Sequence, residues 1–323
     1  MKIKGLVVGL GQIGMGYDYN NVSTGFITSH AKALQEHPDF ELVGGVDPAP
    51  EQRERFVKKY GKPAYKSLET ALQECSPELA IVATPTKEHA NTFGQVLECA
   101  SVRLILCEKP IALNSEDAEM MVTAADSKNI TVAVNYIRRY EPGARILTQR
   151  INSGELGFPL KACVWYSKGI YNNGSHFLNF LSAMFGNVQQ IEVLSKGRLW
   201  DNADPEVDVK VHFERGDAYF LAAREECFSY CEMEIIGPLG KVRYSKSGCN
   251  IDWWSIMPDP DFPEYKILQD TPESIPAEMN RYQYHVLQNI SDFLSGRSEL
   301  YCDGDSGIKT MRILDKIKEA WYG

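Results

Sequence analysis

The first part of the chain alternates short apolar runs with longer segments in which apolar residues recur every three or four positions. The runs, rich in β-branched residues, fit buried strands, and the segments between them fit amphipathic helices. We predict strands at residues 3–9, 41–47, 80–83, 102–107 and 131–136, and helices at residues 51–60, 87–100 and 115–128. Because strands apolar on both faces alternate with helices, the pattern indicates a parallel sheet covered by helices.

After about residue 140 the apolar residues recur with period two, which is typical of half-buried antiparallel strands. We predict hairpins over residues 208–223 and 233–244 and a further strand at 250–256, with an extended, proline-containing arm at 258–276 and two closing helices near 278–294 and 307–321. The second half is therefore predicted as an α+β domain with a large, open, mostly antiparallel sheet. The predicted domains are residues 1–136 and 137–323.

Composition and charge exclude several classes of function. The chain has 323 residues, enough for two domains that each bury a core. Its 34 Lys and Arg against 43 Asp and Glu give a net charge of −9, and no stretch is dense in Lys or Arg, which argues against a nucleic-acid partner. No apolar run has the length of a membrane span or a secretion signal. The eight cysteines include no C-x-x-C pair and are typical of reduced thiols, so we expect a cytoplasmic protein.

A glycine-rich turn follows the first predicted strand, where residues 9–14 read G-L-G-Q-I-G. Glycines in this pattern allow a tight turn and let the backbone approach a pyrophosphate, which the N–H groups of a helix N-terminus bind. Its position after an N-terminal strand favours a dinucleotide site over a simple strand-to-helix turn. The candidate cofactor-binding residues are Gly9, Gly11, Gln12, Ile13 and Gly14.

Such a site requires an acidic residue about 20 positions further on, which binds the adenosine ribose. Asp47 ends the second predicted strand but lies 33 residues after Gly14, and omitting the 14 residues 15–28 leaves a spacing of 19. We interpret residues 15–28 as an insertion, either a cover for the phosphates or substrate or a surface loop. Asp47 favours NAD over NADP because a carboxylate repels a 2′-phosphate, and it can also cap the following helix.

Two further segments follow strands of the predicted sheet, at the edge where such sheets bind ligands. Residues 83–89 read A-T-P-T-K-E-H, and residues 107–110 read C-E-K-P. Lys109 is a candidate catalytic residue, since the neighbouring proline restricts its backbone and this edge faces the cofactor. His89 fits either a brace for the loop or a helix cap. The histidines show no metal-ligand spacing, so no metal is expected.

The last polar segment lies in the second half of the chain and covers the start of a predicted helix and the residues just before it. His176 and Asn179 are three residues apart and share a helix face, and Asn172 lies just upstream, so the three are candidates for one substrate site. A neutral histidine titrates in the range that a base for an alcohol proton requires. A histidine at a helix start can equally be a capping or core residue.

Together these segments resemble the glucose-fructose oxidoreductase / inositol dehydrogenase (Gfo/Idh/MocA) family, in the order in which the family carries them. The resemblance rests on residues 9–14, 83–85 and 108–110 and on Gly174 with His176, and spans nearly the whole chain. It implies an N-terminal Rossmann domain with a doubly wound sheet, and a C-terminal domain whose open sheet packs against a partner subunit in a homodimer or homotetramer. It also implies a nicotinamide site between the domains, with Lys109 and His176 flanking the reacting carbon. The implied cofactor contacts are Thr84, Pro85, His89, Glu108, Lys109 and Asn135.

One departure from the family pattern affects the choice of base. The family usually has D-x-G-x-H-x-x-D, whereas this chain has asparagine at positions 172 and 179. An aspartate beside His176 would raise its basicity, and an asparagine supplies no charge. Lys109 is therefore the favoured candidate for the base, and His176 and the two asparagines are suited to orient sugar hydroxyls. Arg139, just after the last strand of the first domain, fits a phosphate contact of the substrate or a surface salt bridge.

We therefore predict an NAD-dependent oxidoreductase that transfers a hydride between nicotinamide and a hydroxyl or keto carbon of a sugar, nucleotide sugar or cyclitol. Two alternatives stay open. Some relatives oxidise a sugar transiently to cleave a glycosidic bond, which would make the chain an NAD-dependent glycoside hydrolase. The two asparagines also fit a chain that binds NAD as a sensor without catalysis.

Overall fold

The computed structural model describes residues 2–23, 25–201 and 203–322, and the chain divides into two compact units. Unit 1 comprises Met1–Tyr140 and Asn280–Met311, and unit 2 comprises Glu141–Met279 and Arg312–Gly323. The chain thus leaves unit 1 just after the predicted boundary at residue 136. It returns to unit 1 for Asn280–Met311, a segment that the sequence analysis placed in the second domain.

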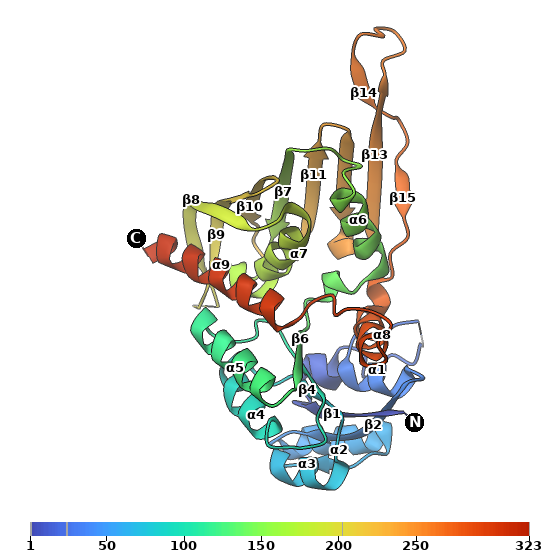
Figure 1. Cartoon of the computed structure of the whole chain (residues 1–323), viewed down its shortest axis with the longest axis vertical. Helices are drawn as coiled ribbons and strands as arrows, with labels where there is room; N and C mark the ends of the chain where they lie inside the picture. The colour runs from blue at the N-terminus through green and yellow to red at the C-terminus, as the bar shows by residue number, and fades with distance from the viewer. Residues whose placement is uncertain (1, 24, 202, 323) are drawn as a thin grey trace. The chain divides into compact units, whose positions relative to one another are not determined.

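Unit 1 contains a six-stranded, wholly parallel sheet with the order β3-β2-β1-β4-β5-β6 (Figure 1). The strands are β1 Ile3–Val8, β2 Phe40–Val46, β3 Ala64–Tyr65, β4 Leu79–Val82, β5 Leu104–Cys107 and β6 Thr131–Val134. Strands β4 and β5 are buried at every residue, as expected for strands covered on both faces. The strand order reverses between β1 and β4, so the predicted doubly wound Rossmann sheet is confirmed.

Capping chemistry marks the ends of some of the unit 1 helices, notably α2 and α5. They are α1 His30–Glu36, α2 Pro50–Tyr60, α3 Leu68–Cys75, α4 His89–Val96, α5 Ser115–Ser127 and α8 Tyr282–Leu294, with short turns η1 Gln12–Gly16, η2 Thr86–Glu88 and η3 Ile137–Arg139. Helix α2 has Pro50 in its first turn and ends at Gly61, whose φ is +63°. The Asn114 side chain caps α5 by accepting the Asp117 N–H at 2.8 Å.

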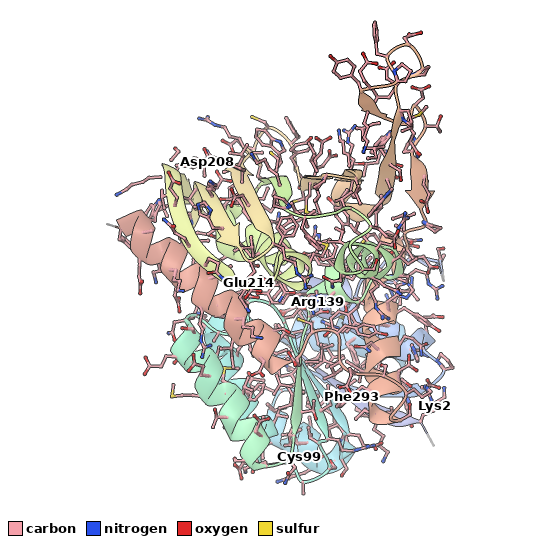
Figure 2. The ribbon with its side chains drawn as sticks, turned by 45° about the horizontal axis from the view of Figure 1, so that its top comes forward. Lys2, Cys99, Arg139, Asp208, Glu214 and Phe293 are labelled. Atoms are coloured by element: carbon pink, nitrogen blue, oxygen red, sulfur yellow. The ribbon has the colours of Figure 1, made fainter. Side chains whose placement is uncertain are left out.

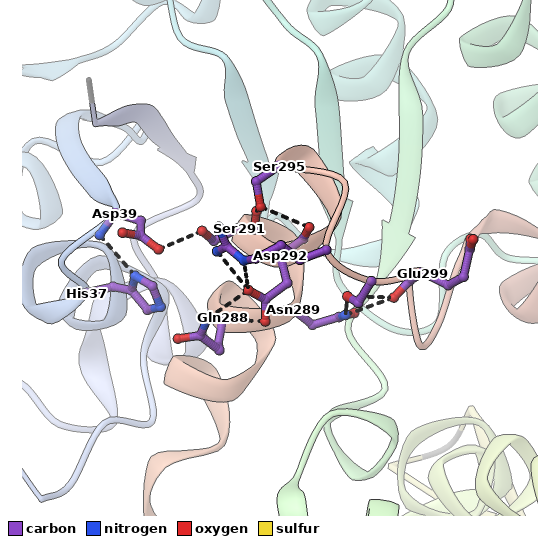
Figure 3. Close-up of polar contacts among 10 residues, drawn as sticks. His37, Asp39, Gln288, Asn289, Ser291, Asp292, Ser295 and Glu299 are labelled. Atoms are coloured by element: carbon purple, nitrogen blue, oxygen red, sulfur yellow. Dashed lines mark hydrogen bonds and ion pairs between the residues drawn. The ribbon is translucent and has the colours of Figure 1, made fainter.

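The returning segment is held in unit 1 by polar contacts between α8 and the loop after α1 (Figure 3). Ser291 donates its hydroxyl hydrogen to the Asp39 carboxylate at 2.6 Å, and Asn289 donates to the Glu299 carbonyl at 2.9 Å. The ring of His37, at the end of α1, packs 4.6 Å from the ring of Tyr284. The Ser291–Asp39 and Tyr284–His37 contacts join residues far apart in the sequence, which explains why α8 belongs to unit 1.

Unit 2 is built on a nine-stranded sheet with the order β14-β13-β12-β11-β7-β10-β9-β8, and β15 pairs with β13. The strands are β7 Leu160–Tyr166, β8 Val188–Trp200, β9 Asp204–Phe213, β10 Gly216–Ala222, β11 Glu232–Gly237, β12 Gly240–Ser245, β13 Asn250–Pro258, β14 Lys266–Leu268 and β15 Glu273–Ile275. Only β7 and β10 pair in parallel, and the other pairs are antiparallel. The predicted α+β class and both predicted hairpins are confirmed.

Helices cover one face of this sheet. They are α6 Pro142–Asn152, α7 Ser175–Phe185 and the end of α9, which runs from Gly304 to Tyr322, and the turns of this unit include η4 Gly169–Gly174 and η5 Lys246–Gly248. Phe177 and Phe180 of α7 pack against Tyr244 of β12, with ring centroids 6.1 and 5.7 Å apart. Strands β13 and β14 extend as an arm from the sheet (Figure 1), in the proline-containing segment predicted as extended.

Candidate functional site

Most of the predicted site residues of unit 1 gather at the carboxyl edge of its sheet, around the reversal between β1 and β4. Parallel strands of this type bind ligands at that edge, because neighbouring connections leave it on opposite faces. Arg139 follows β6 at the carboxyl edge, whereas Cys99 precedes β5 at the amino edge, and Figure 2 shows the two labels at opposite ends of the sheet. A groove of about 800 Å³ at the amino edge is lined by α3 and α4 residues and by none of the predicted site residues.

Each glycine of the predicted turn has a different steric reason to be glycine. A Cβ on Gly9, whose φ is +100°, would lie 2.5 Å from the Ala83 carbonyl oxygen, and one on Gly14 would lie 2.0 Å from the Gly9 carbonyl oxygen. A Cβ on Gly11 would meet nothing within 4 Å. Gly9 and Gly14 are therefore required by the protein's own packing, whereas Gly11 keeps a space open at the surface of the turn, as a bound pyrophosphate requires.

Asp47 links the end of β2 to the glycine turn. Its carboxylate accepts the Leu10 N–H at 2.8 Å and the Ala49 N–H at 2.9 Å, and Ala49 is the residue that precedes α2. Each oxygen retains capacity for another hydrogen bond. The Asp47 carboxylate thus holds the residue just before α2 without capping the helix itself, and it also contacts the backbone of the glycine turn at Leu10.

His89 braces the loop after β4 against the loop after β5. The ring is buried, and its two nitrogens lie 2.9 Å from the Thr84 carbonyl oxygen and 3.1 Å from the Ile111 carbonyl oxygen. Both nitrogens thus face the backbone, which fits the bracing role considered from the sequence. Pro85, in the same loop, is exposed.

The polar atoms at this edge fit a dinucleotide. The buried Thr84 hydroxyl oxygen and the buried Asn135 side-chain carbonyl oxygen have no hydrogen-bond partner within the described part of the chain. Such atoms are usually satisfied by water or a ligand. Together with the open space at Gly11 and the Asp47 carboxylate, they offer an extended set of hydrogen-bonding groups that matches the cofactor predicted from the sequence.

The Glu108-Lys109 pair follows β5 at this edge, and its residues differ in exposure. Glu108 is buried and accepts hydrogen bonds from other elements, whereas Lys109 is half-buried, and the Lys109–Pro110 peptide is cis. A lysine held between a buried carboxylate and a proline at a ligand-binding edge is suited to move a proton on a bound substrate.

The structure describes residues 15–23 and 25–28 of the insertion. The Lys32 ammonium donates to the Asn21, Ser23 and Phe26 carbonyls at 2.7–2.9 Å. The ring of Tyr19 lies under the Arg55 guanidinium, 4.4 Å away, and near the Lys59 ammonium. The segment is therefore a fixed part of unit 1, tied to α1 and α2.

In unit 2, His176 and Asn179 lie one turn apart on α7 and are both buried, and Asn172 belongs to the preceding turn η4. The sequence analysis missed the residue that holds this turn. The Asp204 carboxylate accepts the Tyr171 N–H at 2.9 Å and the Asn172 N–H at 2.8 Å. Asp204 lies 32 residues beyond Asn172, and no sequence spacing connects the two.

We expect Asp204→Ala to lower the free energy of unfolding by about 1 kcal/mol, because two N–H groups at the start of η4 lose their acceptor. Urea unfolding of the variant measures this effect. The exposed Asp270→Ala of the same unit is the control and should leave the midpoint unchanged. An unchanged midpoint for Asp204→Ala would show that the carboxylate does not hold the turn.

Among the described residues, no cluster of three or more His, Cys, Asp or Glu side chains is placed to hold a metal ion. Within the same ranges, every helix is too short or too polar to cross a bilayer.

Comparison with known proteins identifies relatives of unit 1. Residues 3–136 match a family model described as the Gfo/Idh/MocA oxidoreductase family with an NAD-binding Rossmann fold. Glucose-6-phosphate 3-dehydrogenase of Bacillus subtilis is 31% identical over 144 residues, 45% of this chain and 40% of that protein. Myo-inositol 2-dehydrogenase of Thermotoga maritima is 24% identical over 155 residues, 47% of this chain and 42% of that protein. The chain thus spans less than half the length of these curated relatives.

Solved structures match over nearly the full length. The WlbA dehydrogenase of Bordetella pertussis, crystallised with NADH and UDP-GlcNAcA, superposes with a TM-score of 0.79 at 19% identity, covering 99% of this chain and 96% of that one. UDP-N-acetylglucosamine 3-dehydrogenase of Acidithiobacillus ferrooxidans gives a TM-score of 0.78 at 14% identity, covering 99% and 98%. At these identities the likeness shows a shared fold.

Proposed function

From the match of residues 3–136 to the Gfo/Idh/MocA family of NAD-binding oxidoreductases, we propose that the chain belongs to this family and oxidises or reduces a sugar-type substrate with NAD. The reacting carbon would be a hydroxyl or keto carbon of a sugar, nucleotide sugar or cyclitol. The observation that carries this proposal is the set of groups at one sheet edge: the open glycine turn, the Asp47 carboxylate and the half-buried Lys109.

Different residues of unit 1 would bind the cofactor and transfer the proton. Gly11, Gln12 and Ile13 would approach the pyrophosphate, and Asp47 would accept hydrogen bonds from the adenosine ribose, which favours NAD over NADP. When bound, the nicotinamide ring supplies the acceptor or donor of hydride. Lys109 would take the hydroxyl proton during oxidation and return it during reduction.

The residues of unit 2 would orient the substrate. Asn172 and Asn179 offer both donors and acceptors, as sugar hydroxyls require, and His176 adds a ring nitrogen in the same helical segment. Arg139, in η3 of unit 1, is proposed as a contact for a substrate phosphate. The names of the relatives favour this substrate class, since they include a sugar-phosphate dehydrogenase and an inositol dehydrogenase.

The test is nicotinamide absorbance at 340 nm during incubation of the purified protein with a panel of nucleotide sugars, sugar phosphates, free sugars and inositols. We expect one class to change the absorbance, with a much smaller response from NADP than from NAD. Cleavage of a glycoside without net NADH would instead identify the hydrolase considered from the sequence. Stoichiometric NAD binding with no reaction on any compound would contradict the oxidoreductase and favour the sensor.

We also propose that the chain acts in the cytoplasm as a homodimer or homotetramer. The face of the unit 2 sheet opposite α6 and α7 supports an assembly, because it exposes large apolar side chains on neighbouring strands. Trp165 of β7 is 41% exposed and Ile236 of β11 is 54% exposed. Light scattering of the purified protein measures the mass, and a monomer at micromolar concentration would contradict the assembly.

A further inference from the structure

A buried cluster of three polar side chains in unit 1 includes Glu108, the residue that precedes Lys109. The Glu108 carboxylate is its centre: one oxygen lies 2.7 Å from His30 Nε2 and accepts the Asn135 amide N–H at 2.6 Å. His30 is the first residue of α1, and Asn135 follows β6, so three separate elements meet at this carboxylate. His30 and Asn135 are each 1% exposed.

The cluster holds Glu108 in its ionised form. Burial alone would raise the pKa of the Glu108 carboxyl, but the hydrogen bond and charge of His30, the Asn135 amide and the charge of Lys109 keep that pKa below its usual value. An ionised carboxylate only accepts hydrogen bonds, so His30 Nε2 carries the hydrogen between the two residues.

Two further titratable groups near Glu108, Cys107 and Tyr282, are uncharged at neutral pH. Cys107, on the same strand, has its thiol pKa raised by burial and by the Glu108 charge. Tyr282, from the returning segment, has its pKa raised by burial and by the same charge. The carboxylate therefore has Lys109 as its cationic neighbour on its own loop and His30 as its partner on α1.

Glu108 contacts Lys109 directly. Its second oxygen accepts the Lys109 backbone N–H at 3.2 Å. This hydrogen bond attaches the backbone of Lys109, at the start of the loop after β5, to the buried cluster. The two side-chain charges also interact, because the charge of Lys109 helps to lower the pKa of the Glu108 carboxyl, and by the same interaction the carboxylate favours the protonated form of the amine. Both effects act on the residue to which we assign proton transfer.

The insertion determines where His30 begins its helix. The Asp18 carboxylate accepts the Thr28 N–H at 2.7 Å and the Ser29 N–H at 2.9 Å, immediately before α1. Tyr282 donates its hydroxyl hydrogen to the Thr28 carbonyl at 2.9 Å. Helix α1 thus starts beside a carboxylate supplied by the insertion, and its first residue, His30, contacts Glu108.

We propose that His30 and Glu108 are positioning residues that hold Lys109 in place and in its protonated state, and that the insertion places His30 for this role. The inference rests on the proposed function, because it assigns these residues a role in the proton transfer by Lys109. Lys109 is then the proton donor when a ketone is reduced, and it must lose its proton before it accepts one from an alcohol.

The first experiment needs no substrate. Trace acetylation of the purified protein between pH 6 and 11, read by mass spectrometry of the Lys109 peptide, gives the apparent pKa of that amine, with the exposed Lys58 as internal reference. We expect Glu108→Gln to lower the Lys109 pKa by about one unit, since an adjacent negative charge is lost. Identical Lys109 curves in the two proteins would overturn the proposal whether or not a substrate is found. A shifted curve with no reaction on any compound would leave the positioning role standing and contradict the proposed function.

The second experiment uses the pH profile of kcat/KM. His30→Leu removes the donor to Glu108, so the carboxyl pKa rises and kcat/KM should fall as the pH drops below about 7, where the wild type stays flat. We expect kcat to fall about 30-fold with an unchanged Kd for NAD, and His30→Gln, which keeps an N–H donor, to restore most of it.

A matched control separates positioning from general loss of a buried histidine. His37 lies at the other end of α1 and is also 1% exposed, and its ring faces α8 rather than Glu108. His37→Leu should lower the thermal midpoint as His30→Leu does, but its kcat/KM should not fall as the pH drops below about 7. A fall in kcat/KM at low pH in both variants, or in neither, would overturn the role assigned to His30.

Discussion

Replacing Lys109 by methionine is expected to lower kcat by at least about a thousandfold while the Kd for NAD changes by less than about threefold. Methionine fills a similar volume but cannot move a proton, and Lys109 is half-buried at the carboxyl edge of the sheet. Stopped-flow or steady-state absorbance gives kcat, and quenching of protein fluorescence gives the Kd.

The control for this substitution is Lys128→Met. Lys128 follows α5, far from the carboxyl edge, and forms an exposed ion pair with Glu98 at 2.7 Å. Such pairs contribute little to stability, so the control should retain full turnover and an unchanged melting temperature. Turnover by Lys109→Met at a tenth of the wild-type rate or more would assign the proton transfer to another group, with His176 as the next candidate.

Gly11→Ala is expected to weaken NAD binding without destabilising the fold, whereas Gly14→Ala is expected to destabilise the fold itself. A Cβ on Gly11 meets nothing within 4 Å, so the variant should fold with a melting temperature within about 2 °C of wild type. The new methyl group would occupy the space that a pyrophosphate needs, and we expect the Kd for NAD to rise at least about tenfold. Titration calorimetry with NAD measures the change.

Gly14→Ala places its Cβ 2.0 Å from the Gly9 carbonyl oxygen, a contact that only backbone movement can relieve. We expect its melting temperature to fall by about 10 °C even without cofactor. Differential scanning calorimetry of the apo proteins separates the two effects. Normal NAD affinity in Gly11→Ala would show that the dinucleotide does not approach this turn, and normal stability in Gly14→Ala would contradict the packing described for it.

Much of the fold could be predicted because its signals are local. The strands of unit 1 are apolar at nearly every residue, and the hairpins of unit 2 alternate with period two around glycine-containing turns, so short windows identify both. Strands β7 and β8 were not predicted. Strand β8 lies at the edge of its sheet with many exposed residues, and it carries little of the alternation that marks a half-buried strand.

The sequence also identified the glycine turn, Asp47 and Lys109 as candidate site residues, because a dinucleotide site requires fixed residue types at fixed distances from strand ends. The contacts that hold these residues were not found. The Asp204 carboxylate binds the turn before α7 from 32 residues away, and His30 reaches Glu108 across 78 positions. Such pairs depend on how elements pack, which no spacing in a single sequence encodes.

By itself, the sequence determined the order of elements, the class of each half and the residues suited to bind a dinucleotide, since hydrophobic periodicity and glycine chemistry act over a few residues. Only the tertiary structure decided that α8 returns to unit 1, that His89 braces two loops, and that the insertion starts α1 with His30 facing Glu108. The physical reason is that a buried polar group needs a partner, and the fold supplies that partner from whichever segment it brings within hydrogen-bond distance.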